Sequence, residues 1–388
     1  MTGLRRSLSL LDATLVNVGV MIGSAVFLTA SDVARALPQP LLQLAVWAVA
    51  ALLSLPLSPR AADLVAIAAI AALTGINVLG VREGVWTQNV VTGAKVLVVG
   101  GLIAAAFLGS AGSPSHFAPS SHPWTFAAFG AAAIGPLFAF DGWITTSYIG
   151  GEIKSPGRNL PLAALLSIAV VTLLYLGLNA GYLYVLGSDR VAASPLVAAD
   201  TARALLGPRG ADLAAGMVVL ATVGGLNGNI LGGARVLYAM AEAGLFWRAA
   251  GRVHPRFGTP AAALLAQGVV SIGFVFTGRF DQLLTSCLFA SWLFYGLGGV
   301  AVFVLRRRTD LDRPYRVWGY PVVPAAFVAS AALLLVSTVA ADPRDSVLGA
   351  ALLLTGVPAY VFLNRRAHQL MLRPTSEHAS APSTGGEK

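Results

Sequence analysis

Long apolar runs separated by short polar connections fill almost the whole chain. A helix needs about 20 largely apolar residues to cross the hydrocarbon core of a bilayer, and the runs lack the strict alternation of barrel strands. Because backbone polar groups must be hydrogen-bonded within lipid, the runs predict α-helices. The expected spans are residues 12–31, 41–58, 61–80, 88–110, 125–150, 160–186, 211–240, 261–278, 282–305, 321–340 and 346–363.

The composition supports the same fold class. Of the 388 residues, 56% are hydrophobic and only 11% are charged, which is far from the usual composition of soluble domains. We therefore expect an all-α polytopic membrane protein with one membrane domain over residues 1–366. The remaining residues 367–388 are rich in Ser, Thr, Pro and Gly and predict a disordered cytoplasmic tail.

The net charge of +9 predicts membrane topology and no nucleic-acid partner, because the arginines lie mostly in short loops between apolar runs. Eleven full spans would put the two termini on opposite sides, whereas the charges put both in the cytoplasm. One segment is therefore no ordinary span, and 41–58, which runs through Pro56 into the next apolar run, is the suspect. The basic stretches are Arg5–Arg6, Lys154–Arg158, Arg248–Arg256, Arg306–Arg316 and Arg365–Arg366.

Two spans carry residues that interrupt helices. The first contains small residues in Gly19–Phe27, which permit either close helix packing or a helix break. The second carries a proline, two glycines and a carboxylate in Gly135–Trp143. Backbone groups freed at membrane depth are tolerated where they line a cavity or are buried in protein. Two breaks that share a cavity would offer amides to a carboxylate and carbonyls to an ammonium, which suits a zwitterion.

Charged and polar side chains within the spans are further candidates. Lys95 and Asp141 are functional candidates because an intramembrane charge is costly, although Lys95 could snorkel and Asp141 could cap a helix. Cavity lining or gating is a possible role for Trp143, Asn227, Asn229 and Trp292, with helix contact and aromatic packing as the alternatives.

Motifs of catalysis are absent from the sequence. It has no GxxxxGK[ST] phosphate loop and no HExxH motif, and the five histidines fall in expected loops and the tail. The single cysteine, Cys287, excludes an internal disulfide and suggests no metal cluster. We expect no enzyme activity, no cofactor and no metal.

Several motifs together resemble a known family. VGVMIGSAVFLT is similar to the first-span signature of the amino acid, polyamine and organocation transporter superfamily, and LFAFDGW with GEIKSPGRNLP is similar to its sixth span and the following loop. GARVLYAMAEAG, VHPRFGTP and RPYRVWGYP continue the likeness. Within the superfamily the chain resembles the L-type amino acid transporters and bacterial amino acid permeases. The resemblance implies the leucine-transporter fold, with two inverted five-helix repeats, and exchange or secondary active transport of amino acids, neutral ones above all. It leaves open whether there is a partner subunit.

The resemblance also implies roles for individual residues. Amides of Gly23, Ser24 and Ala25 would hold the substrate carboxylate. Carbonyls of Met21, Phe138 and Asp141 would hold its amine. Lys95 would replace a sodium ion and link the first and eighth family spans.

Two departures from the family pattern stand out. Ala25 replaces a glycine, and between Leu55 and Ala61 the chain lacks a cytoplasmic loop and a third span. The lost piece resembles one and a half helices, which leaves as the alternative function a degenerate membrane protein that no longer transports.

Overall fold

The computed structural model describes residues 6–22, 59–118, 139–194, 196–276, 280–308, 319–341 and 343–371, together with residues 125, 132, 136 and 317. In this part of the chain the extended structure is an isolated parallel bridge between Leu8 and Ile153. The helices are α1 Leu10–Met21, α4 Pro59–Leu79, α5 Val81–Leu108, η3 Pro114–Phe117, α7 Thr145–Tyr148, η4 Gly150–Glu152, α8 Pro156–Leu186, α9 Ser188–Ala193, α10 Val197–Leu206, α11 Arg209–Glu242, η5 Arg248–Gly251, α12 Ala261–Val275, α13 Phe280–Arg306, α14 Val322–Ala341 and α15 Pro343–Met371.

Several of these bounds differ from the sequence-based expectation. Helix α5 begins at Val81, seven residues before the expected start at 88, because it continues as a regular helix through the polar residues Arg82 and Glu83. Helices α9 and α10 occupy a stretch for which no element was predicted. Helix α15 continues to Met371, past the expected start of the tail at 367. The expected span 41–58, most of the interval 55–61 and the second half of 12–31 lie outside the described residues.

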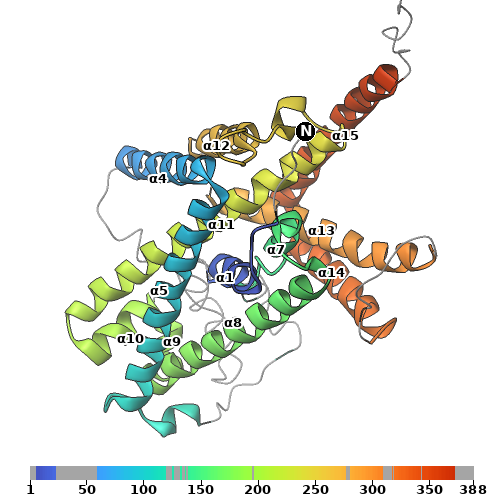
Figure 1. The fold of residues 1–388 in the computed structure, drawn as a ribbon. Helices are drawn as coiled ribbons and strands as arrows, with labels where there is room; N and C mark the ends of the chain where they lie inside the picture. Colours follow the sequence, from blue (N-terminus) through green and yellow to red (C-terminus); the bar gives the residue numbers. More distant parts are fainter. Residues whose placement is uncertain are drawn as a thin grey trace, which may run out of the picture.

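Helix α1 occupies the centre of the arrangement, seen nearly end-on between α5 and α8 in Figure 1. Its start is defined by a capping box, in which the Asp12 N–H donates to the Ser9 hydroxyl and the Ser9 N–H donates to the Asp12 carboxylate. The long helix α11 packs against both α1 and α5. Any group at the end of α1 is therefore enclosed by three helices.

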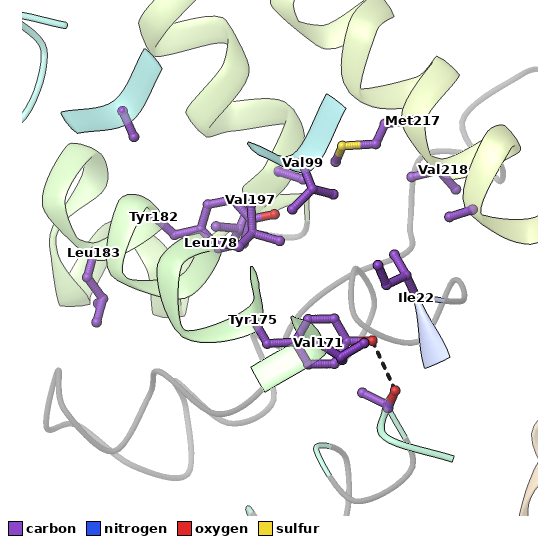
Figure 2. Packing of buried hydrophobic residues seen from close by; sticks show 14 of the residues in the cluster. Ile22, Val99, Val171, Tyr175, Leu178, Tyr182, Leu183, Val197, Met217 and Val218 are labelled. Carbon is purple, nitrogen blue, oxygen red and sulfur yellow. Dashed lines mark hydrogen bonds between the residues drawn. The ribbon is translucent and has the colours of Figure 1, made fainter. Parts of the chain in front are cut away.

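Apolar side chains of α5, α8 and α11 form the largest described core cluster beside the end of α1 (Figure 2). Tyr175, Leu178 and Tyr182 of α8 lie in it, and Val99 of α5 and Val218 of α11 close it from the other side. These positions on α8 are spaced by three and four residues, so they share one face of the helix. The cluster fixes α8 against the region where α1 ends.

Many large apolar side chains on the outside of the helices are exposed. Leu97 is 77% exposed on α5, Leu173 72% on α8 and Val269 70% on α12. Within the described residues, five helices are long and apolar enough to cross a membrane, and four shorter helices are apolar. A soluble protein would not present such faces on several helices. The chain is an all-α polytopic membrane protein.

Several connections gather at one end of the helices. The backbone of Leu8 bonds to those of Glu152 and Lys154, which ties the N-terminal segment to the loop before α8. A cavity of about 390 Å³ is lined by Ser7, the α4–α5 corner and the loop 253–258. Three of the basic stretches of the sequence begin or lie in these connections. We call this side of the molecule the basic end.

Buried amides tie α4, α5 and α11 together. The Asn77 side chain of α4 donates to Asn227 Oδ1 of α11 at 2.8 Å. Asn227 Nδ2 in turn donates to Gln88 Oε1 at 2.8 Å and to the Gly84 carbonyl at 3.2 Å, both on α5. Because all three side chains are fully buried, each bond that is lost leaves a polar group that neither protein nor water can satisfy.

We predict that Asn227→Ala lowers the thermal unfolding midpoint of the purified protein, at a cost of about 1–2 kcal/mol in unfolding free energy. Asn229→Ala is the matched control, since Asn229 lies on the same helix with an exposed side chain. Scanning fluorimetry of both variants tests the prediction. Equal midpoints for the two variants would show that the amide network contributes nothing measurable.

Candidate functional site

Helix α1 stops at Met21, inside the membrane domain. Ile22 has φ −75° and ψ 61°, which leaves the helical region, while its N–H still bonds to the Val18 carbonyl. The last carbonyls of a helix have no partner within it and carry a partial negative charge. The last carbonyls of α1 therefore need hydrogen-bond donors from outside the helix.

Lys95 of α5 supplies the partner. Its ammonium Nζ donates to the Gly19 carbonyl at 2.8 Å and to the Ile22 carbonyl at 2.7 Å, and the residue is 1% exposed. A Cβ added at Gly224 of α11 would lie 2.6 Å from this nitrogen. The lysine thus bridges α5 and α1 while lying directly on α11. Snorkelling to the membrane surface, the alternative considered from sequence, does not describe this geometry.

The second predicted break is also seen. Phe140 N–H still makes a helical bond to the Pro136 carbonyl, but residues 141–144 form turns and α7 starts only at Thr145. Gly142 has φ +119°, a conformation that side chains disfavour. A Cβ at Gly142 would lie 3.0 Å from the Met21 nitrogen. The two interrupted segments are therefore in direct contact.

Tyr175 of α8 joins the two breaks. Its hydroxyl lies 2.5 Å from the Met21 carbonyl oxygen and 3.0 Å from the Ala139 carbonyl oxygen, and one of these bonds is dashed in Figure 2. The single hydroxyl proton is shared between the two acceptors. Since each carbonyl has two lone pairs, the Met21 oxygen can still accept a second hydrogen bond.

Asn17 of α1 makes a second link. Its side-chain N–H group donates to the Trp143 carbonyl at 2.8 Å and to the Thr146 hydroxyl at 3.0 Å. Its oxygen accepts the Thr146 N–H at 2.8 Å. One fully buried amide thereby satisfies backbone groups at the start of α7 that the interruption would leave without partners.

Aromatic side chains surround Asp141. The Tyr295 hydroxyl of α13 donates to Asp141 Oδ1 at 2.7 Å. Trp143 and Trp292 both meet the Tyr295 ring edge-to-face, at centroid distances of 5.6 and 5.7 Å. Phe327 of α14 completes this aromatic group, 6.0 Å from Trp143. The Asp141 carboxylate is thus held against α13.

The structure brings together some of the sequence-predicted residues and separates others. Met21, Lys95, Asp141 and Trp143 lie at or beside the two breaks, and Trp292 joins them through Tyr295. Asn227 is held in the amide network of α4 and α5, and the Asn229 side chain is exposed, so neither joins this group. The remaining candidates, Gly23, Ser24, Ala25 and Phe138, lie outside the described residues.

Comparison with known families identifies the chain. A family model described as amino acid permease matches residues 54–362, most of the chain. The chain belongs to the amino acid permease family. The matched range begins after α1, so it includes the second break and Lys95 but not the first break.

Relatives of this permease are amino acid transporters by name. The chain is 30% identical over 306 residues to the serine/threonine exchanger SteT of Bacillus subtilis, over 78% of this chain and 69% of the exchanger. It is 30% identical to the b(0,+)-type amino acid transporter 1 of Mus musculus, over 81% of this chain and 66% of that transporter. It is 30% identical to the human cystine/glutamate transporter, over 58% of this chain and 44% of that protein.

Three residues of the permease site were not found from sequence. Asn17 is a polar residue inside an apolar run, and that signal could have identified it. Tyr175 and Tyr295 stand among many aromatic and apolar residues in their runs. Nothing in their spacing distinguishes a hydroxyl that bonds across helices from one that reaches the membrane surface.

We predict that Tyr175→Phe destabilises the permease by about 1–2 kcal/mol, because the Met21 and Ala139 carbonyls lose their shared donor. Tyr184→Phe is the control, since Tyr184 lies near the C-terminal end of the same helix, α8, where its ring stacks on Phe107 of α5 and Phe117 of η3. Hydrogen exchange of the peptide containing Met21 should accelerate only in Tyr175→Phe. Identical exchange in both variants would contradict the link between the breaks.

Proposed function

We propose that this permease exchanges neutral L-amino acids across the cell membrane by alternating access. The observation that carries the proposal is the contact between the two interrupted segments, at Met21 and Gly142. Peptide groups freed at such a point recognise the carboxylate and amine common to all amino acids. The relatives named as amino acid transporters, one of them an exchanger, support this substrate class and mode.

In this proposal the amides of Gly23, Ser24 and Ala25 bind the substrate carboxylate. The free lone pair on the Met21 carbonyl and the carbonyls of Phe138 and Asp141 bind its amine. The proposed transport domain is residues 1–366, with both termini on the cytoplasmic side. That orientation follows from the arginine-rich stretches, of which three lie at the basic end.

Lys95 takes the place of a coupling cation in the proposal. Its ammonium already lies between carbonyls of α1 and the surface of α11, where a metal ion would otherwise balance those oxygen atoms. A fixed positive charge needs no sodium gradient. Exchange of one amino acid for another is then the expected mode, because the helices return to their first conformation with a second substrate bound.

A buried ion pair is proposed to close the cytoplasmic side. Arg235 Nε of α11 donates to Glu152 Oε1 at 2.8 Å, and both side chains are almost fully buried. Arg235 Nη1 also donates to the Leu231 carbonyl, whereas Glu152 Oε2 and Arg235 Nη2 have no hydrogen-bond partner among the described residues. Such incompletely satisfied buried charges gain little net stability from pairing. Separation of the pair is therefore favourable only where the opening path brings water to both charges.

One observation favours an alternative. Residues 22–58 are too few for the rest of the first span and two further full spans at about 20 residues each. A permease without its third family span could bind an amino acid and yet fail to move it. The alternative function is therefore a non-transporting membrane protein of the same ancestry.

Counterflow in proteoliposomes separates the two functions. The purified permease is reconstituted with internal unlabelled serine or leucine, and entry of the labelled amino acid is followed with and without internal substrate. The proposal expects uptake that depends on internal amino acid. Binding by scintillation proximity without any uptake would establish the alternative, and neither binding nor uptake of any amino acid would reject both.

We predict that Lys95→Met reduces the exchange rate about tenfold or more and changes the dissociation constant of the substrate by less than about threefold. The two α1 carbonyls lose their cation, so movement of α1 is impaired more than the binding groups themselves. Arg209→Met on the exposed start of α11 is the control for loss of one positive charge. Unchanged exchange in Lys95→Met would rule out the cation role.

A further inference from the structure

A cavity of about 700 Å³ lies between the second break, α8, α13 and α14. Its described lining contains no residue of α1, α5 or α11, and Asp141 is not part of it. The cavity is therefore distinct from the place where the two breaks meet. Trp143 and Tyr295 form the wall that separates this apolar cavity from Asp141.

The walls of the apolar cavity do not suit a zwitterion. Every lining residue is apolar or glycine except Tyr295, whose hydroxyl already donates to Asp141. Phe294 and Val323 on its rim are 58% and 50% exposed, so it opens on a helix surface that faces lipid. A hydrocarbon chain from the bilayer fits this chemistry.

The C-terminal end of α13 is rich in arginine. Val302 lines the cavity, and Arg306 follows one helical turn later, with its guanidinium 3.7 Å from the centre of the Tyr320 ring. The stretch 306–316 holds five arginines and two aspartates, and the described ones, Arg306 to Arg308, are exposed. Phosphate is the anion that clustered arginines at a membrane surface recognise.

The dimensions of the cavity and of one lipid leaflet agree. Tyr295, at the inner wall, and Arg306 are eleven residues apart on α13, a rise of about 16 Å. One leaflet contributes about 15 Å of the hydrocarbon thickness. A lipid whose phosphate lies at Arg306 would therefore place the end of its acyl chain against Trp143 and Tyr295.

We propose that the apolar cavity is a binding site for an anionic phospholipid, with one acyl chain between α8, α13 and α14 and the headgroup phosphate on Arg306 and Arg307. The acyl chain packs against Trp143, which follows Asp141 in the second break. Lipid occupancy would thereby support the break from the side opposite to α1. The site does not depend on which amino acid is transported, or on whether any is.

Native mass spectrometry of the full-length protein tests the site, with phosphatidylglycerol and phosphatidylcholine titrated separately. We expect one phosphatidylglycerol to be retained about tenfold more tightly than phosphatidylcholine. Gly298→Leu should abolish that retention, because a Cβ at Gly298 meets no atom within 4 Å and a leucine there grows into the cavity. Gly273→Leu on α12, where a Cβ also meets nothing, is the matched control.

The headgroup half of the site has its own variants. Arg306→Gln with Arg307→Gln should remove the preference for phosphatidylglycerol, whereas Arg248→Gln with Arg252→Gln, exposed at the basic end, should keep it. Phosphatidylglycerol with a diazirine near the acyl terminus should label peptides containing Trp143 or Phe327 in the unmodified protein. This labelling does not rely on any variant folding.

Three results would overturn the proposal. The first is retention by Gly298→Leu equal to that of Gly273→Leu in folded protein. The second is equal affinity for the two lipids, which would indicate unselective annular contact. The third is labelling of other helices, or displacement of the label by a free amino acid, which would make the cavity part of the substrate path.

Discussion

The contact between the Lys95 ammonium and the last carbonyls of α1 is the interaction on which the rest of the structure depends. A helix that stops inside a membrane leaves acceptors that neither water nor lipid can satisfy. A buried ammonium, equally unable to remain alone, satisfies them in turn. Each partner lowers the cost of burying the other, which explains why both occur at this position.

Hydrogen bonds from side chains repair both interruptions at the points where the regular backbone pattern fails. Tyr175 supplies a donor to carbonyls on each side, and Asn17 completes the start of α7. These bonds come from α1 and α8, which also share the apolar core cluster. The breaks are consequently fixed by packing and by polar contacts at once, and their geometry is built in before any ligand arrives.

The sequence predicted the class of fold and the location of both breaks, because long apolar runs and intramembrane Gly, Pro and charge each have one dominant physical cause. It predicted α8 and α11 to within a few residues, since their apolar runs end at loops. Helix α10 was not predicted, because Asp200 and Arg203 lower its average hydropathy although its other face is buried. The partner of Lys95 was implied by the family resemblance. The hydrogen bonds of the Tyr175 and Tyr295 hydroxyls were not predicted, because they depend on how helices pack against one another, and the sequence of one helix does not show this.

Gly80 separates α4 from α5 and is the only residue between them. A link of one residue keeps the end of α4 next to the start of α5, so the two helices meet at a sharp corner. Asn77 of α4 and Gln88 of α5 bond to α11, and Lys95 of α5 bonds to α1. A rotation of α1 would therefore act on α5 at Lys95, and the corner at the start of α5 borders the loop 253–258 at the molecular surface.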